Sequence, residues 1–292
     1  MAKTKVEDRT TVVEEEPTLE AYVERSKPPA PGGQETLVIP DRGDGWRVFG
    51  VVSDTHLGSK HERLDVLNKL YDLFEQEGIT QVLHGGNWVE GESRFNKHDI
   101  KIYGMDAQFN YFIDNYPCRN GMRTFYVSGD DHEGWWQQRE VINIGQTLED
   151  KALRAGRHDL KFLGYSEADI ELAAKRGSAV LRLMHGGGGA AYAYSYVLQK
   201  QVESFQPGEK PQILVMGHHH KWDCCYPRGV HAFMPGCTQD QSIFMRKRKI
   251  EAHVGGVICW MQQADDGTPT RFRAEWIPFY DRGFYERRYG CP

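Results

Sequence analysis

From Trp46 onward, short apolar segments rich in β-branched and aromatic residues alternate with longer segments in which apolar residues recur at helical spacing. This alternation predicts an α/β domain, because buried strands are short apolar runs and the helices packed on a sheet are amphipathic. The predicted strands cover residues 47–52, 81–83, 124–127, 179–184 and 212–216, and four more are predicted near Ala232, Val257, Phe272 and Trp276.

Two helices are predicted from apolar spacing and end signals. Apolar residues recur at helical spacing over residues 64–74, and Gly78 follows where the helix should end. Ser166 and Asp169 have the spacing of a capping box, in which two side chains satisfy free N–H groups at a helix start. This spacing predicts a second helix over residues 170–175.

The first 45 residues differ in composition from the rest of the chain. They contain ten acidic and six basic residues, and residues 27–33 are rich in proline and glycine. We therefore expect residues 1–45 to form an acidic extension outside the core, with one short amphipathic helix over residues 18–26. Residues 46–292 are then the folded domain.

Composition excludes several classes of protein. With 36 basic and 41 acidic residues the net charge is -5, so the whole surface cannot be a basic coat for nucleic acid. Apolar residues at 39% and charged residues at 26% are typical of a globular domain with a sizeable core. No apolar stretch is long enough to cross a membrane and the polar start does not resemble a secretion signal, so a cytoplasmic protein is expected.

The six cysteines have no repeated spacing and no CxxC pair. Reduced thiols are expected, and of the adjacent Cys224 and Cys225 one should be buried and the other exposed.

Five polar clusters follow predicted strands directly. They occupy residues 53–56, 85–87, 129–133, 185–187 and 217–220. In an α/β sheet the loops after the carboxyl ends of the strands bind ligands. One such cluster would be weak evidence, since a single histidine is usually structural, but five in order predict a metal site.

The residue types in these clusters indicate which metals fit. Imidazole and carboxylate together suit Mn, Fe, Zn or Co, whereas Ca and Mg prefer shells of oxygen. The clusters contain no cysteine, which argues against a structural zinc site. In an extended segment Asp54 and His56 point to one side, as do His218 and His220, so each pair can address one site.

The clusters read as DTH, GN, GDDH, H and GHHH. In this order they resemble the motifs of the calcineurin-like metallophosphoesterases, which are DxH, GD, GNH, H and GHxH, over residues 46–279. The resemblance implies a four-layer sandwich of two mixed β-sheets flanked by helices. It also implies two divalent metal ions, with manganese preferred and iron, zinc or cobalt as alternatives. His185, its following glycines and residues 193–200 look like a virus-associated and prokaryotic branch of the family.

The resemblance assigns three ligands to each ion, one ligand that bridges them and one acid. They are Asp54, His56 and His220 for the first ion, Asp131, His185 and His218 for the second, Asn87 as the bridge, and His132 as the general acid or charge stabiliser beside the scissile phosphate. Two ions of this kind clamp a phosphate and activate water, so the implied reaction is phosphoester hydrolysis.

Two positions depart from the family pattern. Asn87 stands where the family has a bridging aspartate, and Asp131 stands where it has an asparagine. The number of carboxylates is kept, but the second charge moves onto one ion. Asn87 either belongs to a natural variant that binds its second metal more loosely, or was introduced by a deliberate substitution of aspartate. We prefer the second explanation because the motif around Asn87 is otherwise regular. Asp130 is an alternative ligand to Asp131, although only Asp131 directly precedes His132.

Side chains near the clusters are candidates for contact with a substrate. Trp88, Trp135 and Tyr192 could stack on nucleobases or simply pack, and Arg246 begins a basic run over residues 246–249 that could bind phosphates or be solvated. The other histidines, among them His84 and His253, are interpreted as structural.

The predicted function is a dimetal phosphodiesterase acting on DNA, RNA or a nucleotide. A phosphomonoesterase and a non-catalytic protein that binds phosphorylated ligands are the alternatives, and a homo-oligomer is also considered.

Overall fold

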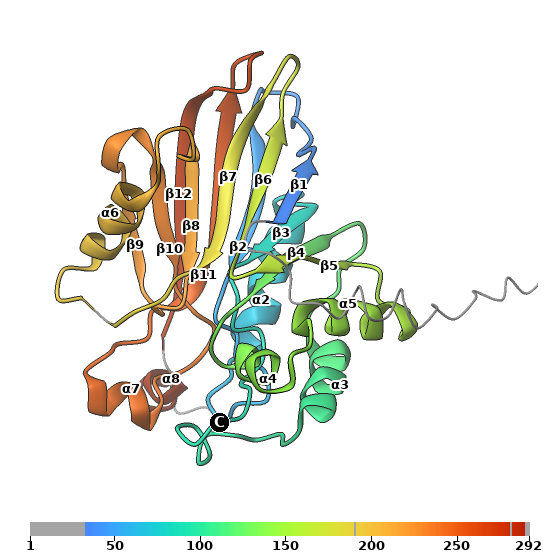
Figure 1. The fold of residues 1–292 in the computed structure, drawn as a ribbon, viewed down its shortest axis with the longest axis vertical. Helices are drawn as coiled ribbons and strands as arrows, with labels where there is room; N and C mark the ends of the chain where they lie inside the picture. The colour runs from blue at the N-terminus through green and yellow to red at the C-terminus, as the bar shows by residue number, and fades with distance from the viewer. Residues whose placement is uncertain (1–32, 190, 281, 290–292) are drawn as a thin grey trace, which may run out of the picture.

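The computed structural model describes residues 33–189, 191–280 and 282–289, and within these residues two six-stranded β-sheets pack face to face (Figure 1). The strands of the first sheet are β2 (Arg47–Val52), β3 (Gln81–His84), β4 (Arg123–Ser128), β5 (Leu160–Tyr165), β11 (Val254–Gln263) and β12 (Pro269–Phe279). Their order is β12–β11–β2–β3–β4–β5. β2 to β5 run parallel and β11 runs antiparallel to β2, so the sheet is mixed.

The second sheet is mixed as well. Its strands are β1 (Gly33–Leu37), β6 (Glu167–Ala173), β7 (Ser178–His185), β8 (Ile213–Gly217), β9 (Trp222–Cys225) and β10 (His231–Pro235), in the order β1–β6–β7–β8–β10–β9. β7, β8 and β10 run parallel, while β6 and β9 are antiparallel to their neighbours β7 and β10.

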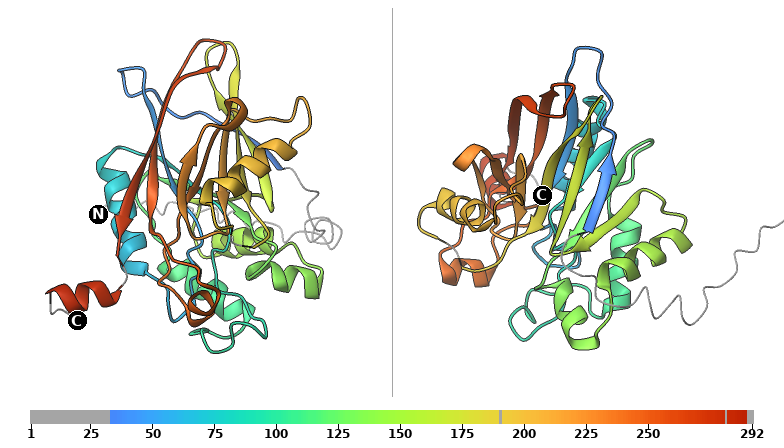
Figure 2. Two further views of the ribbon diagram at one scale, coloured as in Figure 1. Left: turned by 90° about the vertical axis from the view of Figure 1, so that its left-hand side faces the viewer. Right: turned by 45° about the horizontal axis from the view of Figure 1, so that its top comes forward.

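Helices cover both outer faces of the sandwich. The helices are α2 (Leu64–Gln76), α3 (Met105–Asn115), α4 (Glu133–Glu140), α5 (Ile144–Arg154), α6 (Tyr194–Ser204), α7 (Ile243–Arg248) and α8 (Arg282–Tyr289). α2 to α5 pack on the first sheet and α6 packs on the second, on opposite sides of the molecule (Figure 2). The predicted four-layer sandwich is therefore confirmed.

β2 illustrates why this sequence builds layers. Its side chains alternate between two cores: Val48 and Val52 pack among the helices, whereas Phe49 and Val51 pack between the sheets. Both faces are buried, so the strand is a continuous apolar run. This is the pattern from which β2 was predicted.

Residues 170–175 were predicted as a helix, and this prediction is wrong. They fall in and directly after β6, where Ala168, Ile170 and Leu172 are buried at every second position. Period-two burial is the signature of a strand, and it outweighs the capping-box spacing. The structure also merges the strands predicted near Phe272 and Trp276 into β12.

The predicted extension is only partly within the described residues. Residues 33–37 form β1, which pairs in parallel with β6, and Leu37 is buried. The described fold therefore begins before residue 45. Residues 1–32, which include the helix predicted over residues 18–26, lie outside the described residues.

Two smaller predictions can be compared with the structure. Cys224 is exposed as expected of one member of the pair, but Cys225 is only partly buried. In the described parts of the chain, no helix has the length and apolar character required to span a membrane.

Candidate metal centre

Loops that follow five parallel strands of the two sheets carry the predicted ligands. Asp54 and His56 follow β2, Asn87 follows β3, Asp131 and His132 follow β4, His185 ends β7, and His218 and His220 follow β8. Because parallel strands end at the same edge of a sheet, these loops meet at one end of the sandwich. α4, which starts next to His132, and α7 lie at this end (Figure 1).

Asp54, His56 and His220 form the first group of converging side chains. Their candidate ligand atoms lie within 4.8 Å of one another. His56 Nε2 is 3.1 Å from His220 Nε2, which is 3.4 Å from Asp54 Oδ1. The group joins the two sheets, because two of its members follow β2 and the third follows β8.

Asp131, His185 and His218 form the second group. Asp131 Oδ1 lies 3.2 Å from His185 Nε2, and Asp131 Oδ2 lies 3.4 Å from His218 Nδ1. Asp130, in contrast, is exposed. The structure thus turns Asp131, and not Asp130, towards the two histidines.

Asn87 lies beside the second group. Its Oδ1 is buried and has no hydrogen-bond partner among the described residues. A Cβ atom at Gly129 would lie 2.6 Å from this oxygen and 3.1 Å from His185 Nε2, so glycine is required there. The Asn87 carbonyl accepts a hydrogen bond from the His56 N–H at 3.0 Å, which connects the loop after β3 to the first group.

These distances fit a pair of bound cations. Ligand atoms about 2.0–2.1 Å from one ion are roughly 3.0–3.4 Å apart in octahedral or tetrahedral geometry, as several atoms are here. A buried amide oxygen without a partner is costly unless a donor or a cation occupies its lone pairs. The residues present therefore fit two divalent ions.

In three of the histidines, the ring nitrogen that faces away from the ligand group contacts an oxygen atom, as is usual for histidines that bind metals. His185 Nδ1 donates to the carbonyl of Gly85 at 2.8 Å, and His218 Nε2 donates to the carbonyl of Gly188 at 3.1 Å. His56 Nδ1 lies 3.2 Å from Glu90 Oε2. With an ion bound, such contacts would fix the tautomer, and the inner nitrogen of each ring would then offer its lone pair to the ion.

The charged groups of the site are paired with one another. Burial opposes protonation of His185, but Asp131 outweighs it and raises the pKa of His185 to about 9, and the pKa of His220 is likewise raised, so both imidazoles must release a proton to bind a cation. Burial opposes ionisation of Asp54, but the His220 imidazole outweighs it and holds the pKa of Asp54 well below its usual range. Burial is likewise outweighed at Asp131, where hydrogen bonds from His185 and His218 lower the pKa. Burial lowers the pKa of His56 to about 4, so this imidazole is neutral at pH 7.

The site residues have unusual backbone conformations. Six of them have positive φ angles although none is glycine: Asp54 (50°), His56 (47°), Asn87 (52°), His132 (47°), His218 (81°) and His220 (54°). The side chains of Asp54 and His56 therefore converge through left-handed turns, and not through the extended alternation that was predicted. Strained backbone of this kind concentrates at functional sites.

His132 lies next to the first group. Its ring is edge-on to His56 at a centroid distance of 4.3 Å and stacks on Trp135 at 4.7 Å. Its Nδ1 donates to the carbonyl of Glu90 at 2.7 Å. The Nε2 atom is therefore the one that can exchange a proton with a ligand.

Two buried glutamates support the centre and were not predicted. Glu90 contacts His56 through its carboxylate and His132 through its carbonyl. Glu133 accepts hydrogen bonds from the backbone N–H groups of Asn87 and Gly129, at 2.9 and 2.8 Å, and burial raises its pKa to about 8. Their sequence signal is position: Glu90 comes three residues after Asn87, and Glu133 directly follows His132.

The four residues predicted to contact a substrate differ in their exposure. Trp88 is fully buried against Phe109, Phe112 and Tyr126, so its prediction as a substrate contact is wrong: it is a core residue that happens to follow Asn87. The other candidates are accessible: Trp135 is partly exposed, and Tyr192 and Arg246 are exposed. Their contact with a substrate stays a prediction.

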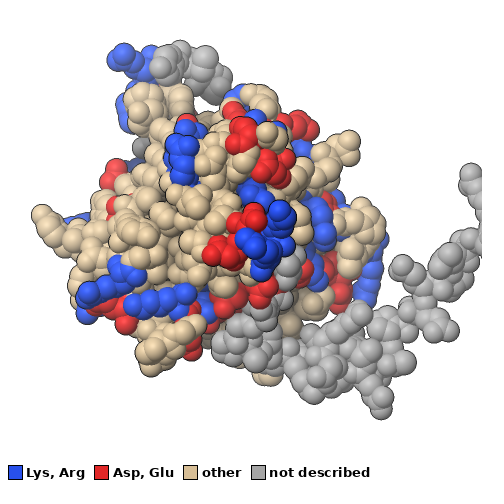
Figure 3. Space-filling view, turned by 90° about the horizontal axis from the view of Figure 1, so that it is seen from above, with Lys and Arg blue, Asp and Glu red and all other residues tan. Residues whose placement is uncertain are grey.

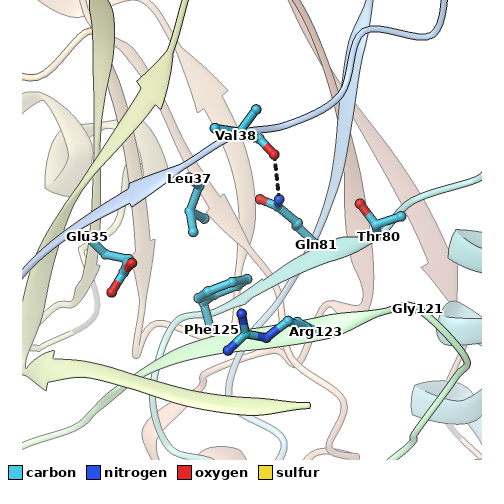
Figure 4. Close-up of a pocket in the computed structure, with 8 residues that line it drawn as sticks. All are labelled: Glu35, Leu37, Val38, Thr80, Gln81, Gly121, Arg123 and Phe125. Atoms are coloured by element: carbon cyan, nitrogen blue, oxygen red, sulfur yellow. Dashed lines mark hydrogen bonds between the residues drawn. The ribbon is translucent and has the colours of Figure 1, made fainter. Parts of the chain in front are cut away.

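A separate pocket of about 360 Å³ lies where β3 and β4 begin, at the opposite end of these strands (Figure 4). Gln81, Arg123 and Phe125 are among its lining residues, and Gln81 Nε2 donates to the carbonyl of Val38 at 2.7 Å. None of the described lining residues belongs to the two ligand groups. This pocket therefore has no part in the metal centre.

Residues 48–244 match the calcineurin-like phosphoesterase superfamily domain, and because the match covers more than half of the chain, the chain belongs to this superfamily. No curated protein sequence matches it.

Several solved structures are similar to this one. A novel archaeal phosphodiesterase is 15% identical, with 79% of this chain and 99% of that chain covered and a TM-score of 0.43. Vps29 complexed with Zn²⁺ from Entamoeba histolytica is 15% identical, with 80% and 99% covered and a TM-score of 0.39. GAP50 of Plasmodium is 12% identical, with 80% and 85% covered and a TM-score of 0.42.

Proposed function

We propose that this protein is a metal-dependent phosphodiesterase acting on nucleic acid or nucleotides. The observation that carries the proposal is the pair of three-residue groups, Asp54–His56–His220 and Asp131–His185–His218, at one end of the sandwich beside His132. In this proposal each group holds one divalent ion, with manganese preferred because mixed carboxylate, amide and imidazole ligands suit it. Bound ions of this kind supply Lewis-acid stabilisation of the phosphoryl oxygens and lower the pKa of water.

The chain's own residues have distinct tasks in this proposal. The Glu90 carbonyl holds the Nδ1 proton of His132, so Nε2 gives a proton to the leaving oxygen of the phosphoester. Trp135 stacks on the His132 ring and fixes its plane. Glu90 also holds His56, so one residue positions both an ion ligand and the proton donor.

The surroundings of the centre support a polyanionic substrate. The loop before α7 contacts the centre, because the Thr238 N–H donates to the Asp54 carbonyl at 3.3 Å. α7 and the residue after it present four exposed cations over residues 246–249. At the far end of the molecule, both signs of charge are intermixed (Figure 3). Cations beside the site would attract the phosphates that flank the scissile bond.

Hydrolysis of two synthetic esters tests the proposal. With Mn²⁺ added, bis-p-nitrophenyl phosphate should be cleaved with a higher kcat/KM than p-nitrophenyl phosphate, and a chelator should abolish both reactions. Faster cleavage of the monoester would indicate a phosphomonoesterase instead. No turnover, together with fewer than two bound ions and tight binding of nucleotides, would indicate a non-catalytic binding protein.

A further inference from the structure

A pocket of about 460 Å³ lies between β9, the start of β11 and the end of β12. Its volume is within the range of roughly 300–1,000 Å³ that is typical of small-molecule sites. The lining side chains that matter here are Trp222, Glu251, His253, Trp276 and Tyr280. None of them has a task in the metal centre described above.

The pocket is connected to the first ligand group through the backbone. The His253 N–H donates to the carbonyl of His220 at 2.9 Å, and the Trp222 N–H donates to His253 Nδ1 at 2.9 Å. One wall of the pocket is thus fixed by the same loop that presents His220 to the centre. The pocket and the first ligand group are therefore adjacent along this loop.

The walls of the pocket are aromatic. Trp222 and Trp276 stack with a centroid distance of 5.4 Å and an angle of 7° between their planes. The Trp276 ring packs over Gly236 and Gly255, where a Cβ atom would come within 2.5 and 2.7 Å of it. Tyr280 is 56% exposed and adds another ring to the lining. Flat aromatic walls suit a flat aromatic ligand.

The polar groups of the pocket specify the ligand further. His253 Nδ1 accepts a hydrogen bond, so its proton is on Nε2, which donates to Glu251 Oε2 at 3.4 Å. The Glu251 side chain is 67% exposed, and its other carboxylate oxygen can accept hydrogen bonds from a ligand. A nucleobase with an exocyclic amino group offers both a stacking face and N–H donors. A hydrocarbon ligand would offer no donor to this carboxylate.

We propose that this pocket binds the base of a nucleotide whose phosphate is held at the metal centre. The proposal rests on the proposed function for the position of the phosphate. The recognition of the base itself depends only on the pocket. The two can therefore be tested separately.

Binding of free nucleosides tests the pocket without hydrolysis. Guanosine, adenosine, cytidine and uridine are titrated into the protein in the presence of a chelator, and tryptophan fluorescence and calorimetry report binding. We expect saturable binding with quenching by the three nucleosides that carry an amino group, and weaker binding of uridine. Absence of saturable binding by every nucleoside would overturn the proposal.

Variants assign the binding to this pocket. Glu251→Ala and Tyr280→Ala should each weaken guanosine binding about tenfold. Tyr226→Ala and Glu275→Ala are matched controls, since both residues are exposed and neither lines the pocket. Guanosine affinity that is unchanged in both pocket variants, or lowered equally in the controls, would place the binding elsewhere and contradict the proposal.

Turnover then separates this proposal from the proposed function. Glu251→Ala should lower kcat/KM about tenfold for the p-nitrophenyl ester of guanosine 5′-phosphate and leave it unchanged for bis-p-nitrophenyl phosphate. Equal effects on both esters would overturn the role of the pocket in substrate binding. If neither ester is cleaved by the parent protein, the proposed function fails, while the nucleoside titration still decides whether the pocket binds a base.

Discussion

At the scale of single residues, His132 is the side chain whose task can be separated from metal binding. We predict that His132→Ala keeps two ions but lowers kcat for bis-p-nitrophenyl phosphate about 10²-fold or more, because it removes a positioned proton donor. Metal analysis and steady-state kinetics measure the two effects. His158→Ala, an exposed histidine on the loop before β5, is the control. Loss of metal from His132→Ala would show that this imidazole is a ligand.

Asn87 determines how much negative charge the two ions share. Its amide oxygen is neutral and is buried without a partner, so a carboxylate at the same place would add the charge that two cations favour. We predict that Asn87→Asp tightens Mn²⁺ binding at least about tenfold and raises phosphodiester turnover. Calorimetry and kinetics measure these changes.

Asn115→Asp adds the same charge at the exposed end of α3 and should change neither quantity. Unchanged affinity and rate in Asn87→Asp would mean that the amide does not limit the centre, whether asparagine is natural there or introduced.

His84 supports the centre as a neutral, buried imidazole. Its Nε2 is 3.1 Å from Thr55 Oγ1, and burial lowers its pKa to about 3 from an ordinary value of 6.5. Below pH 6.5 the unfolded chain therefore binds a proton that the folded chain does not. This residue's contribution to the free energy of unfolding is lost as the pH falls from about 6.5 towards 3, by about 1.4 kcal/mol per pH unit.

We predict that His84→Gln removes this dependence. Between pH 7 and pH 5 the parent protein should lose about 2 kcal/mol more stability than the variant, as measured by urea unfolding at both values. Parallel curves for the two proteins would show that His84 takes up its proton in the folded state.

At the scale of elements, the loop after β4 is shaped around the second ligand group. We predict that Gly129→Ala lowers affinity for one ion at least about tenfold while the protein stays folded, because the new methyl group collides with Asn87 Oδ1. Metal analysis after dialysis measures the affinity, and circular dichroism measures the fold. Gly187→Ala adds a methyl group where no atom lies within 4 Å. Full retention of both ions in Gly129→Ala would show that the loop relaxes.

The strands that could be predicted from sequence are those whose pattern of apolar residues fits a strand and does not fit a helix. β2, β3, β4, β7 and β8 are apolar runs in short segments bounded by polar clusters, and no helix fits them. β6 was predicted wrongly because Ser166 and Asp169 have helical spacing by chance, whereas the buried Ile170 alternates with partly buried neighbours as in a strand. Local end signals are weaker than the period of burial, since the period reports what the element packs against.

The metal ligands could be predicted because each is a polar residue at the end of an apolar strand. Trp88 could not be placed, because its neighbour Asn87 faces the centre while the indole turns into the core. Glu90 was missed for a related reason: its task is to hold His56 and His132, and such contacts exist only after folding. The residues that support a site therefore emerge from the structure more than from the sequence.

At the scale of the whole molecule, the two ligand groups join the two sheets. Asp54 and Asp131 belong to loops of the first sheet, while His185, His218 and His220 belong to the second. Ions bound there would hold the sheets together and stabilise the folded state by mass action. We predict that Mn²⁺ at 100 times its Kd raises the Tm by about 5–10 °C for each site, and that a chelator reverses the shift.

Differential scanning calorimetry measures this effect. Asp131→Asn keeps the shape of the side chain and removes its charge, so it should abolish about half of the shift. A Tm that does not respond to Mn²⁺ in the parent protein would contradict binding between the sheets.

The positive φ angles at the site limit which amino acids can occupy these positions. Asparagine, aspartate and glycine tolerate a left-handed backbone, whereas the branched side chains of valine, isoleucine and threonine clash with the backbone in that conformation. In a random library selected only for soluble expression, positions 54 and 87 should accept the first three residues and reject the β-branched ones, even though catalysis is never assayed. Exchange between aspartate and asparagine at position 87 is thus open to drift, because the backbone accommodates either one.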